Sequence, residues 1–132
     1  MKNQKIVLIE DDEILAKVLK EELAGSDFDV LSAYDGEAGL KLVQKEKPDL
    51  LLLDILLPKM HGLDVLKILK SKEETKGIPV IALTMLGQDE DIKKGFELGV
   101  DDYIVKSQHA VAEIVEKVKS FFSKETHPGI QK

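Results

Sequence analysis

The sequence predicts a (βα)5 domain, a doubly wound α/β fold with a five-stranded parallel sheet in the order 2-1-3-4-5 and helices on both faces. Short apolar runs alternate along the chain with stretches whose apolar residues recur every three or four positions. The runs are apolar at nearly every position, which is typical of parallel strands buried on both faces. Right-handed crossovers leave few topologies for such units, and this order is a common one.

The first two strand-helix units follow one another from residue 5. KIVLI, residues 5–9, predicts a strand. A helix follows, with apolar residues spaced by three and four: Ile14, Leu15, Val18, Leu19 and Leu23. FDVLSA, residues 28–33, predicts the second strand, and the next helix carries Ala38, Leu42 and Val43. We expect Asp12, just before the first helical pattern, to cap that helix.

Three further units complete the predicted fold. DLLLL, IPVIAL and DYIV, at residues 49–53, 78–83 and 102–105, predict the third, fourth and fifth strands. Each is followed by a helical pattern, and the apolar residues of these three patterns are Leu63, Leu66 and Leu69, then Ile92 and Phe96, then Val111, Ile114, Val115, Val118 and Phe122.

Composition bounds the class of protein. With 132 residues, 43% of them apolar, the chain has the size of one domain, predicted at residues 1–122 and followed by a linker-like tail at 123–132. We expect a soluble, cytoplasmic protein, because no apolar run is long enough to span a membrane and the N-terminus lacks a signal-peptide pattern. Cysteine is absent, which excludes disulfides and thiolate metal sites. The net charge of -6 and the scattered lysines argue against nucleic acid as a direct partner.

Polar residues stand at the ends of four of the predicted strands. Glu10 and Asp11 follow the first strand and Asp54 follows four leucines, while Thr84 and Lys106 follow the fourth and fifth strands. In this flavodoxin-like order, ligands bind at the carboxyl ends of the strands, beside the switch between strands 1 and 3. A carboxylate inside so apolar a run is costly to bury without a partner. We therefore expect these side chains to converge at one edge of the sheet.

This set of residues favours a metal-assisted phosphoryl site. Three carboxylates, from Glu10, Asp11 and Asp54, repel one another unless protons or a cation intervene. Oxygen ligands suit Mg²⁺, which is typically bound by one or two carboxylates together with phosphate oxygens. Lys106 supplies a positive charge and Thr84 a hydroxyl donor for the oxygens of a phosphoryl group.

The combined motifs resemble the receiver domain of bacterial two-component response regulators. The match runs over roughly residues 4–122 and rests on IVLIEDDE, LLLLDILLPKMHG, VIALT and GVDDYIVK. The resemblance implies that Asp54 accepts a phosphoryl group from a histidine kinase or a phosphotransfer histidine. It also implies that Asp11 and Asp54 ligate Mg²⁺ directly, with the backbone carbonyl of Leu56 as a third ligand and Glu10 acting through water.

The same resemblance implies a phosphorylation-controlled signalling protein. Lys106 would pair with Asp54 before phosphorylation and with the phosphoryl group afterwards. Thr84 would move to bond the phosphoryl group and Tyr103 would swing inward, changing the surface formed by the fourth helix, fifth strand and fifth helix. A downstream protein would bind this surface. The protein would assist its own phosphotransfer and dephosphorylation but would turn over no external substrate.

Three alternatives belong to other classes. An aspartyl-phosphate phosphohydrolase typically has a second acid two residues after the acceptor, where this chain has Leu56. A flavin or nucleotide carrier would favour a glycine-rich or hydroxyl-rich loop after the first strand, where this chain has EDDE. A receiver that acts only as a scaffold typically lacks the acceptor or the lysine, and both are present.

Three positions depart from the commonest pattern of the resembling family. Ser107 follows the lysine in place of a proline preceded by a cis bond, which would be costly before serine. Met85 follows Thr84 where a small residue is usual. His61 stands where the loop after the acceptor often carries an acidic residue, and we expect it to be an exposed loop histidine.

Overall fold

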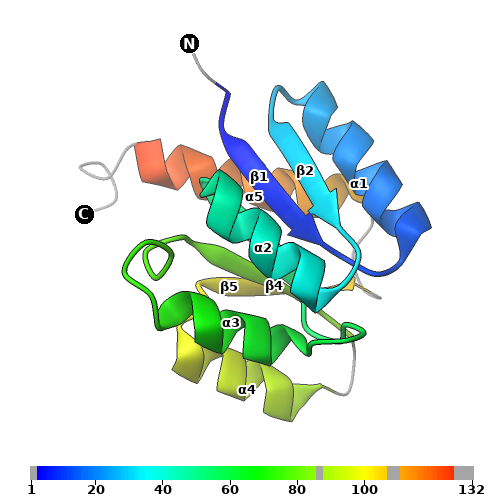
Figure 1. Ribbon diagram of the computed structural model, residues 1–132. Coiled ribbons are helices and arrows are strands. Elements are labelled where there is room, and N and C mark those ends of the chain that lie inside the picture. The colour runs from blue at the N-terminus through cyan, green and yellow to red at the C-terminus, as the bar shows by residue number, and fades with distance from the viewer. Residues whose placement is uncertain (1–2, 86–87, 107–110, 127–132) are drawn as a thin grey trace.

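The predicted sheet is confirmed in the computed structural model, which describes residues 3–85, 88–106 and 111–126 (Figure 1). Five parallel strands pair in the order β2-β1-β3-β4-β5 and alternate with five helices in the described part of the chain. The strands are β1 (Lys5–Ile9), β2 (Asp29–Ala33), β3 (Leu50–Asp54), β4 (Val80–Thr84) and β5 (Asp102–Val105). The helices are α1 (Glu13–Gly25), α2 (Gly36–Glu46), α3 (Gly62–Lys70), α4 (Asp89–Leu98) and α5 (Val111–Thr126).

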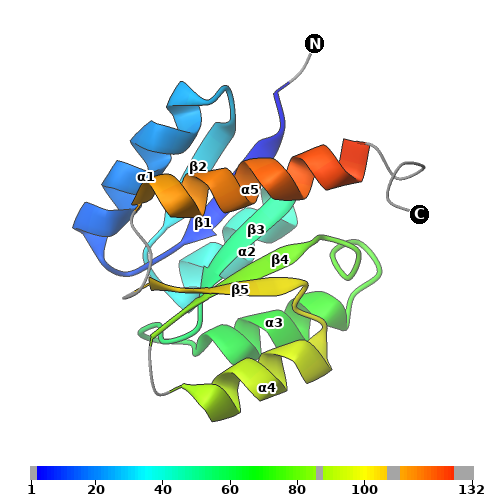
Figure 2. The same cartoon turned by 180° about the vertical axis from the view of Figure 1, so that it is seen from behind.

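Two apolar layers cover the sheet, one on each face. Helices α1 and α5 lie on one side, and α2, α3 and α4 on the other (Figures 1 and 2). Successive strand residues supply opposite layers, because side chains alternate across a strand. Ile6 and Leu8 of β1 pack with α1 and α5, whereas Val7 and Ile9 pack with α2 and α3. Burial on both faces explains why the strands are almost wholly apolar.

Four apolar residues expected from the helical patterns lie outside the core. Ile14 and Val18 of α1 are 79% and 38% exposed, and Phe96 of α4 is 44% exposed. Ala38 of α2 is exposed as well. The pattern marks an apolar face, but the sheet and the neighbouring helices cover only part of that face. In α1 the covered positions are Ala16, Leu19 and Leu23.

Side chains cap the first turns of α1, α2 and α3. Asp12 Oδ1 accepts hydrogen bonds from the backbone N–H groups of Ile14 and Leu15 at 3.1 Å, which confirms the cap expected for α1. His61 Nδ1 accepts from the backbone N–H of Leu63 at 3.2 Å and caps α3. The expectation of an exposed loop histidine at this position is therefore wrong, because the ring is half-buried against the helix that it caps.

Helix α5 continues to Thr126, past the predicted end of the domain at residue 122. The division into a domain and a tail stays a prediction. Ser107 and the peptide bond that precedes it lie outside the described residues. Within the residues described, no helix has the length and apolar character needed to cross a membrane.

The register of the sheet brings the ends of four strands to one edge. Ile9 pairs with Leu53, Asp54 with Leu83, and Thr84 with Val105. The last residues of β3 and β4, Asp54 and Thr84, therefore lie at nearly the same level as Glu10 and Lys106, which follow β1 and β5.

Candidate acidic site at the carboxyl edge of the sheet

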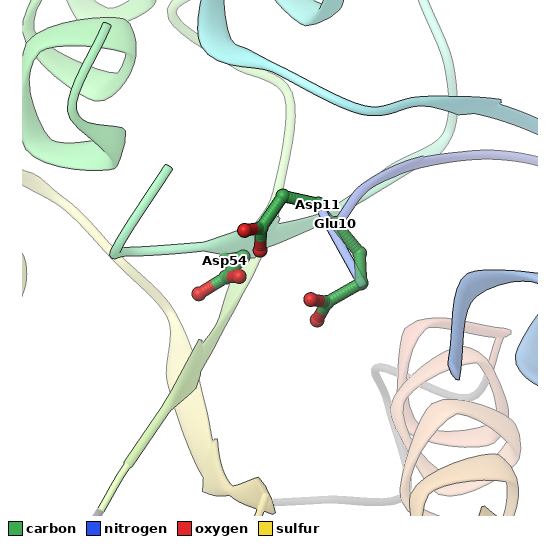
Figure 3. Close-up of side chains that lie close together, drawn as sticks. All are labelled: Glu10, Asp11 and Asp54. Atoms are coloured by element: carbon green, nitrogen blue, oxygen red, sulfur yellow. The ribbon is translucent and has the colours of Figure 1, made fainter. Parts of the chain in front are cut away.

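Three carboxylates gather where β1 and β3 end (Figure 3). Glu10 is completely buried and Asp54 is 2% exposed, whereas Asp11 is exposed. One oxygen from each lies within 4.8 Å of the others. The convergence predicted for these three residues is confirmed, and the two buried charges need compensation from nearby groups.

Lys106 supplies that compensation from the end of β5. Its Nζ lies 3.0 Å and 3.2 Å from the two carboxylate oxygens of Glu10, and 3.2 Å from Asp54 Oδ2. The pairing of Lys106 with Asp54 agrees with the expectation from the sequence. The stronger, two-oxygen contact with Glu10 was not anticipated, because the residues are 96 positions apart and only the folded sheet brings them together.

The electrostatics of the site favour a protonated Asp54 when no cation is bound. Burial and, after it, the negative charge of Glu10 raise the pKa of Asp54 to about 8, and the attraction of Lys106 offsets only part of this rise. Burial lowers the pKa of Lys106, but the attraction of Asp54 and Glu10 outweighs it, so the pKa of the ammonium group is raised. Lys106 is therefore charged at neutral pH.

We expect the raised pKa of Asp54 to make stability depend on pH. Between pH 3.8 and about 8 the folded, metal-free protein holds a proton on Asp54 that the unfolded chain has lost. The free energy of unfolding should therefore fall as the pH rises through this range and level off above it. Urea unfolding in chelator measures this, with Asp54→Asn as the matched variant. A constant difference between the two proteins from pH 4 to pH 8 would contradict the assignment.

The two predicted switch residues, Thr84 and Tyr103, are the last residue of β4 and the second residue of β5. Thr84 is fully buried, and its hydroxyl donates to the carbonyl of Ile104 at 3.5 Å, the outer limit of a hydrogen bond. Tyr103 is 36% exposed and packs edge-on against Phe96 of α4, with ring centroids 5.5 Å apart. The structure thus has Tyr103 on the surface between β5 and α4.

The loop after β3 keeps Asp54 in place. Asp54 Oδ1 accepts from the backbone N–H of Leu56 at 3.1 Å, which holds the carboxylate over the end of its own strand. The loop then folds back so closely that a Cβ atom on Gly62 would lie 2.5 Å from the Asp54 carbonyl oxygen. Leu56, two residues after Asp54, is 48% exposed and brings no polar side chain to the site.

The carboxylates fit a hard divalent cation. Mg²⁺ binds oxygens at about 2.0–2.1 Å, so opposite ligands are about 4.2 Å apart, close to the spacing within this cluster. Both oxygens of Glu10 contact Lys106, and one of them also accepts from the backbone N–H of Asp12 at 3.1 Å. Asp11 and Asp54 are therefore better placed than Glu10 to contact a cation directly.

Fold and site together define an α/β domain with a cluster of carboxylates, suited to a divalent cation, beside a partly buried lysine. The family model of the response regulator receiver domain matches residues 6–119. The chain belongs to this family, and it is therefore a receiver domain of two-component signal transduction.

Known proteins of the family resemble the chain over most of its length. It is 40% identical over 104 residues to the alkaline phosphatase synthesis transcriptional regulatory protein PhoP of Bacillus subtilis, which covers 79% of this chain and 42% of PhoP. The chain thus spans less than half of that relative. The phosphorylated cyanobacterial phytochrome response regulator RcpA is 32% identical, with a TM-score of 0.80 over 92% of this chain and 93% of RcpA. The Mn²⁺-bound response regulator Rcp1 is 30% identical, with a TM-score of 0.79 over 90% and 94% of the two chains.

Proposed function

We propose that this protein is a phosphorylation-controlled signalling switch in which Asp54 accepts a phosphoryl group from a histidine kinase or a phosphotransfer histidine. The observation that carries the proposal is the position of Asp54. It is a buried carboxylate at a strand end, with a lysine ammonium 3.2 Å away and with the carboxylates of Glu10 and Asp11 close to it. An acceptor needs this pairing of a cation site with a fixed positive charge, because both stabilise the oxygens of the transferred group.

In the proposed transfer, a carboxylate oxygen of Asp54 attacks the phosphorus of a phosphohistidine. A P–O bond forms, the P–N bond breaks, and the departing imidazole takes up a proton. Asp11, Asp54 and the backbone carbonyl of Leu56 would hold Mg²⁺, with Glu10 in contact through water. The bound ion would neutralise charge on the phosphoryl oxygens. The phosphorylated state of RcpA and the bound Mn²⁺ of Rcp1 support both parts of this proposal by similarity.

The proposed signal passes from Asp54 to the surface formed by α4, β5 and α5. Lys106 would keep contact with the new phosphoryl group, and Thr84 would exchange its long bond to Ile104 for a phosphoryl oxygen. Tyr103 would then leave its position against Phe96 and turn inward, which would change the surface offered to a downstream protein. We place this exchange in the cytoplasm, without direct binding of nucleic acid.

The rival functions fit the site less well. A phosphohydrolase would need a general acid two residues beyond Asp54, and Leu56 cannot donate a proton. A scaffold that ignores phosphorylation has no need of a partly buried lysine that contacts two buried carboxylates, because this arrangement costs desolvation energy. We therefore expect no turnover of external phosphoesters.

A direct test is incubation of the purified protein with phosphoramidate or acetyl phosphate. In the presence of Mg²⁺ the intact mass should increase by one phosphoryl group, and hydroxylamine should remove it, as it does from an acyl phosphate. Excess chelator should prevent the increase, because the carboxylate cluster then repels the donor. Full labelling in chelator, or a product that resists hydroxylamine, would overturn the proposal.

A further inference from the structure

The side chain of Gln88 bridges the end of β4 and the start of α4. Its Oε1 accepts a hydrogen bond from the backbone N–H of Met85 at 2.5 Å, and its Nε2 donates to Asp91 Oδ2 at 3.2 Å. Gln88 is the residue directly before α4, yet its side chain makes no capping bond to that helix. The side chain therefore reaches back to the strand instead of capping the helix.

The direction of the Met85 N–H follows from the sheet. In a parallel strand the backbone groups of successive residues point alternately to the two neighbouring strands. The backbone carbonyl of Leu83 accepts from the N–H of Ile55 at 3.1 Å, so the backbone groups of Leu83 face β3. Those of Thr84 therefore face β5, and the N–H of Met85 faces β3 again. The Ile55 carbonyl is engaged by the N–H of Gly62 at 2.8 Å. The Met85 N–H thus points toward the end of β3, next to Asp54, and Gln88 supplies its acceptor.

A phosphoryl group on Asp54 could accept a hydrogen bond from the Met85 N–H. Two other donors, the ammonium of Lys106 and the N–H of Leu56, already contact Asp54, and the hydroxyl of Thr84 donates to the carbonyl of Ile104. A phosphoryl oxygen carries negative charge and is a stronger acceptor than the neutral amide oxygen of a glutamine. The two acceptors therefore compete for the same N–H.

We propose that Gln88 is a latch that restrains the resting protein by occupying the Met85 N–H. A phosphoryl group on Asp54 displaces the Gln88 oxygen and takes this donor. The released side chain no longer ties β4 to Asp91, and the first turn of α4 is free to shift. Breaking the hydrogen bond between Gln88 and Met85 costs free energy, which reduces the net free energy gained when the phosphoryl group binds. This inference rests on the proposed function and adds to it a residue that sets the balance between resting and activated states.

The test measures how tightly beryllofluoride, a phosphoryl analogue, binds to the full chain with saturating Mg²⁺. Gln88→Met keeps the length of the side chain and removes both polar atoms, so the Met85 N–H is left without its competing acceptor. We expect this variant to bind beryllofluoride about fivefold more tightly than wild type, the size of effect expected from one hydrogen bond. The Met85 amide resonance should differ from wild type before beryllofluoride is added and coincide with it afterwards.

Asp91→Asn is the matched control, because it retains an acceptor for Gln88 Nε2 and removes only the charge at the start of α4. Its affinity should stay within about twofold of wild type. Gln88→Ala is a second test variant, because an introduced methionine side chain can make new packing contacts. It should show the same gain in affinity for beryllofluoride. Equal affinity and equal Met85 shifts in wild type and both Gln88 variants would overturn the latch alone. Failure of every protein to bind beryllofluoride would overturn the proposed function with it.

Discussion

Asp54→Asn is expected to abolish the gain of a phosphoryl group from phosphoramidate completely. Asparagine keeps the shape of the side chain and can still accept from the Leu56 N–H, but it has no carboxylate oxygen to attack phosphorus. It also removes one of the two carboxylates that we propose contact Mg²⁺ directly. Intact-mass measurement after incubation with donor and Mg²⁺ checks the result, and the amide spectrum verifies that the variant is folded.

Asp35→Asn is a suitable control, because Asp35 caps α2 and is not part of the acidic cluster. It should be labelled like wild type. Undiminished labelling of Asp54→Asn would show that the phosphoryl group goes elsewhere and would remove Asp54 as the acceptor.

Lys106→Met is expected to lower the free energy of unfolding by about 3 kcal/mol at pH 8, the cost of leaving buried charges without their partner. Glu10 and Asp54 would then face each other without the ammonium group that contacts both. The loss should be smaller at pH 5, because a protonated carboxyl group needs no counter-ion. Urea unfolding of metal-free protein at the two pH values measures the difference.

Lys106→Arg, which keeps the charge, should recover part of this stability at pH 8. An equal loss for Lys106→Met at both pH values would mean that packing, and not charge, explains the effect. In the presence of Mg²⁺ and beryllofluoride, Lys106→Met should fail to shift the amide resonances of α4, because the phosphoryl analogue loses its fixed positive partner.

The alternation of apolar runs and helical periods was sufficient to predict the order of the elements and the sheet topology. Strands such as Leu50–Asp54 are buried on both faces, so their composition alone indicates a covered parallel sheet. The topology then placed Glu10, Asp11, Asp54, Thr84 and Lys106 at one edge. The order of the elements and the residues at this edge are predictable for two reasons. Sequence periodicity is a local property of the chain, and the right-handedness of crossovers is a general rule for parallel sheets.

Only the tertiary structure decided which groups pair at that edge and which apolar residues face water. Lys106 contacts both Glu10 and Asp54, and the side chain of Gln88 accepts from the backbone N–H of Met85. No periodicity in the sequence specifies these contacts. Ile14 belongs to the apolar pattern of α1 but is 79% exposed, because the neighbouring elements cover only one side of that helix. A sequence determines which faces are apolar and which residues end the strands. The packing of distant elements against one another determines what those residues touch.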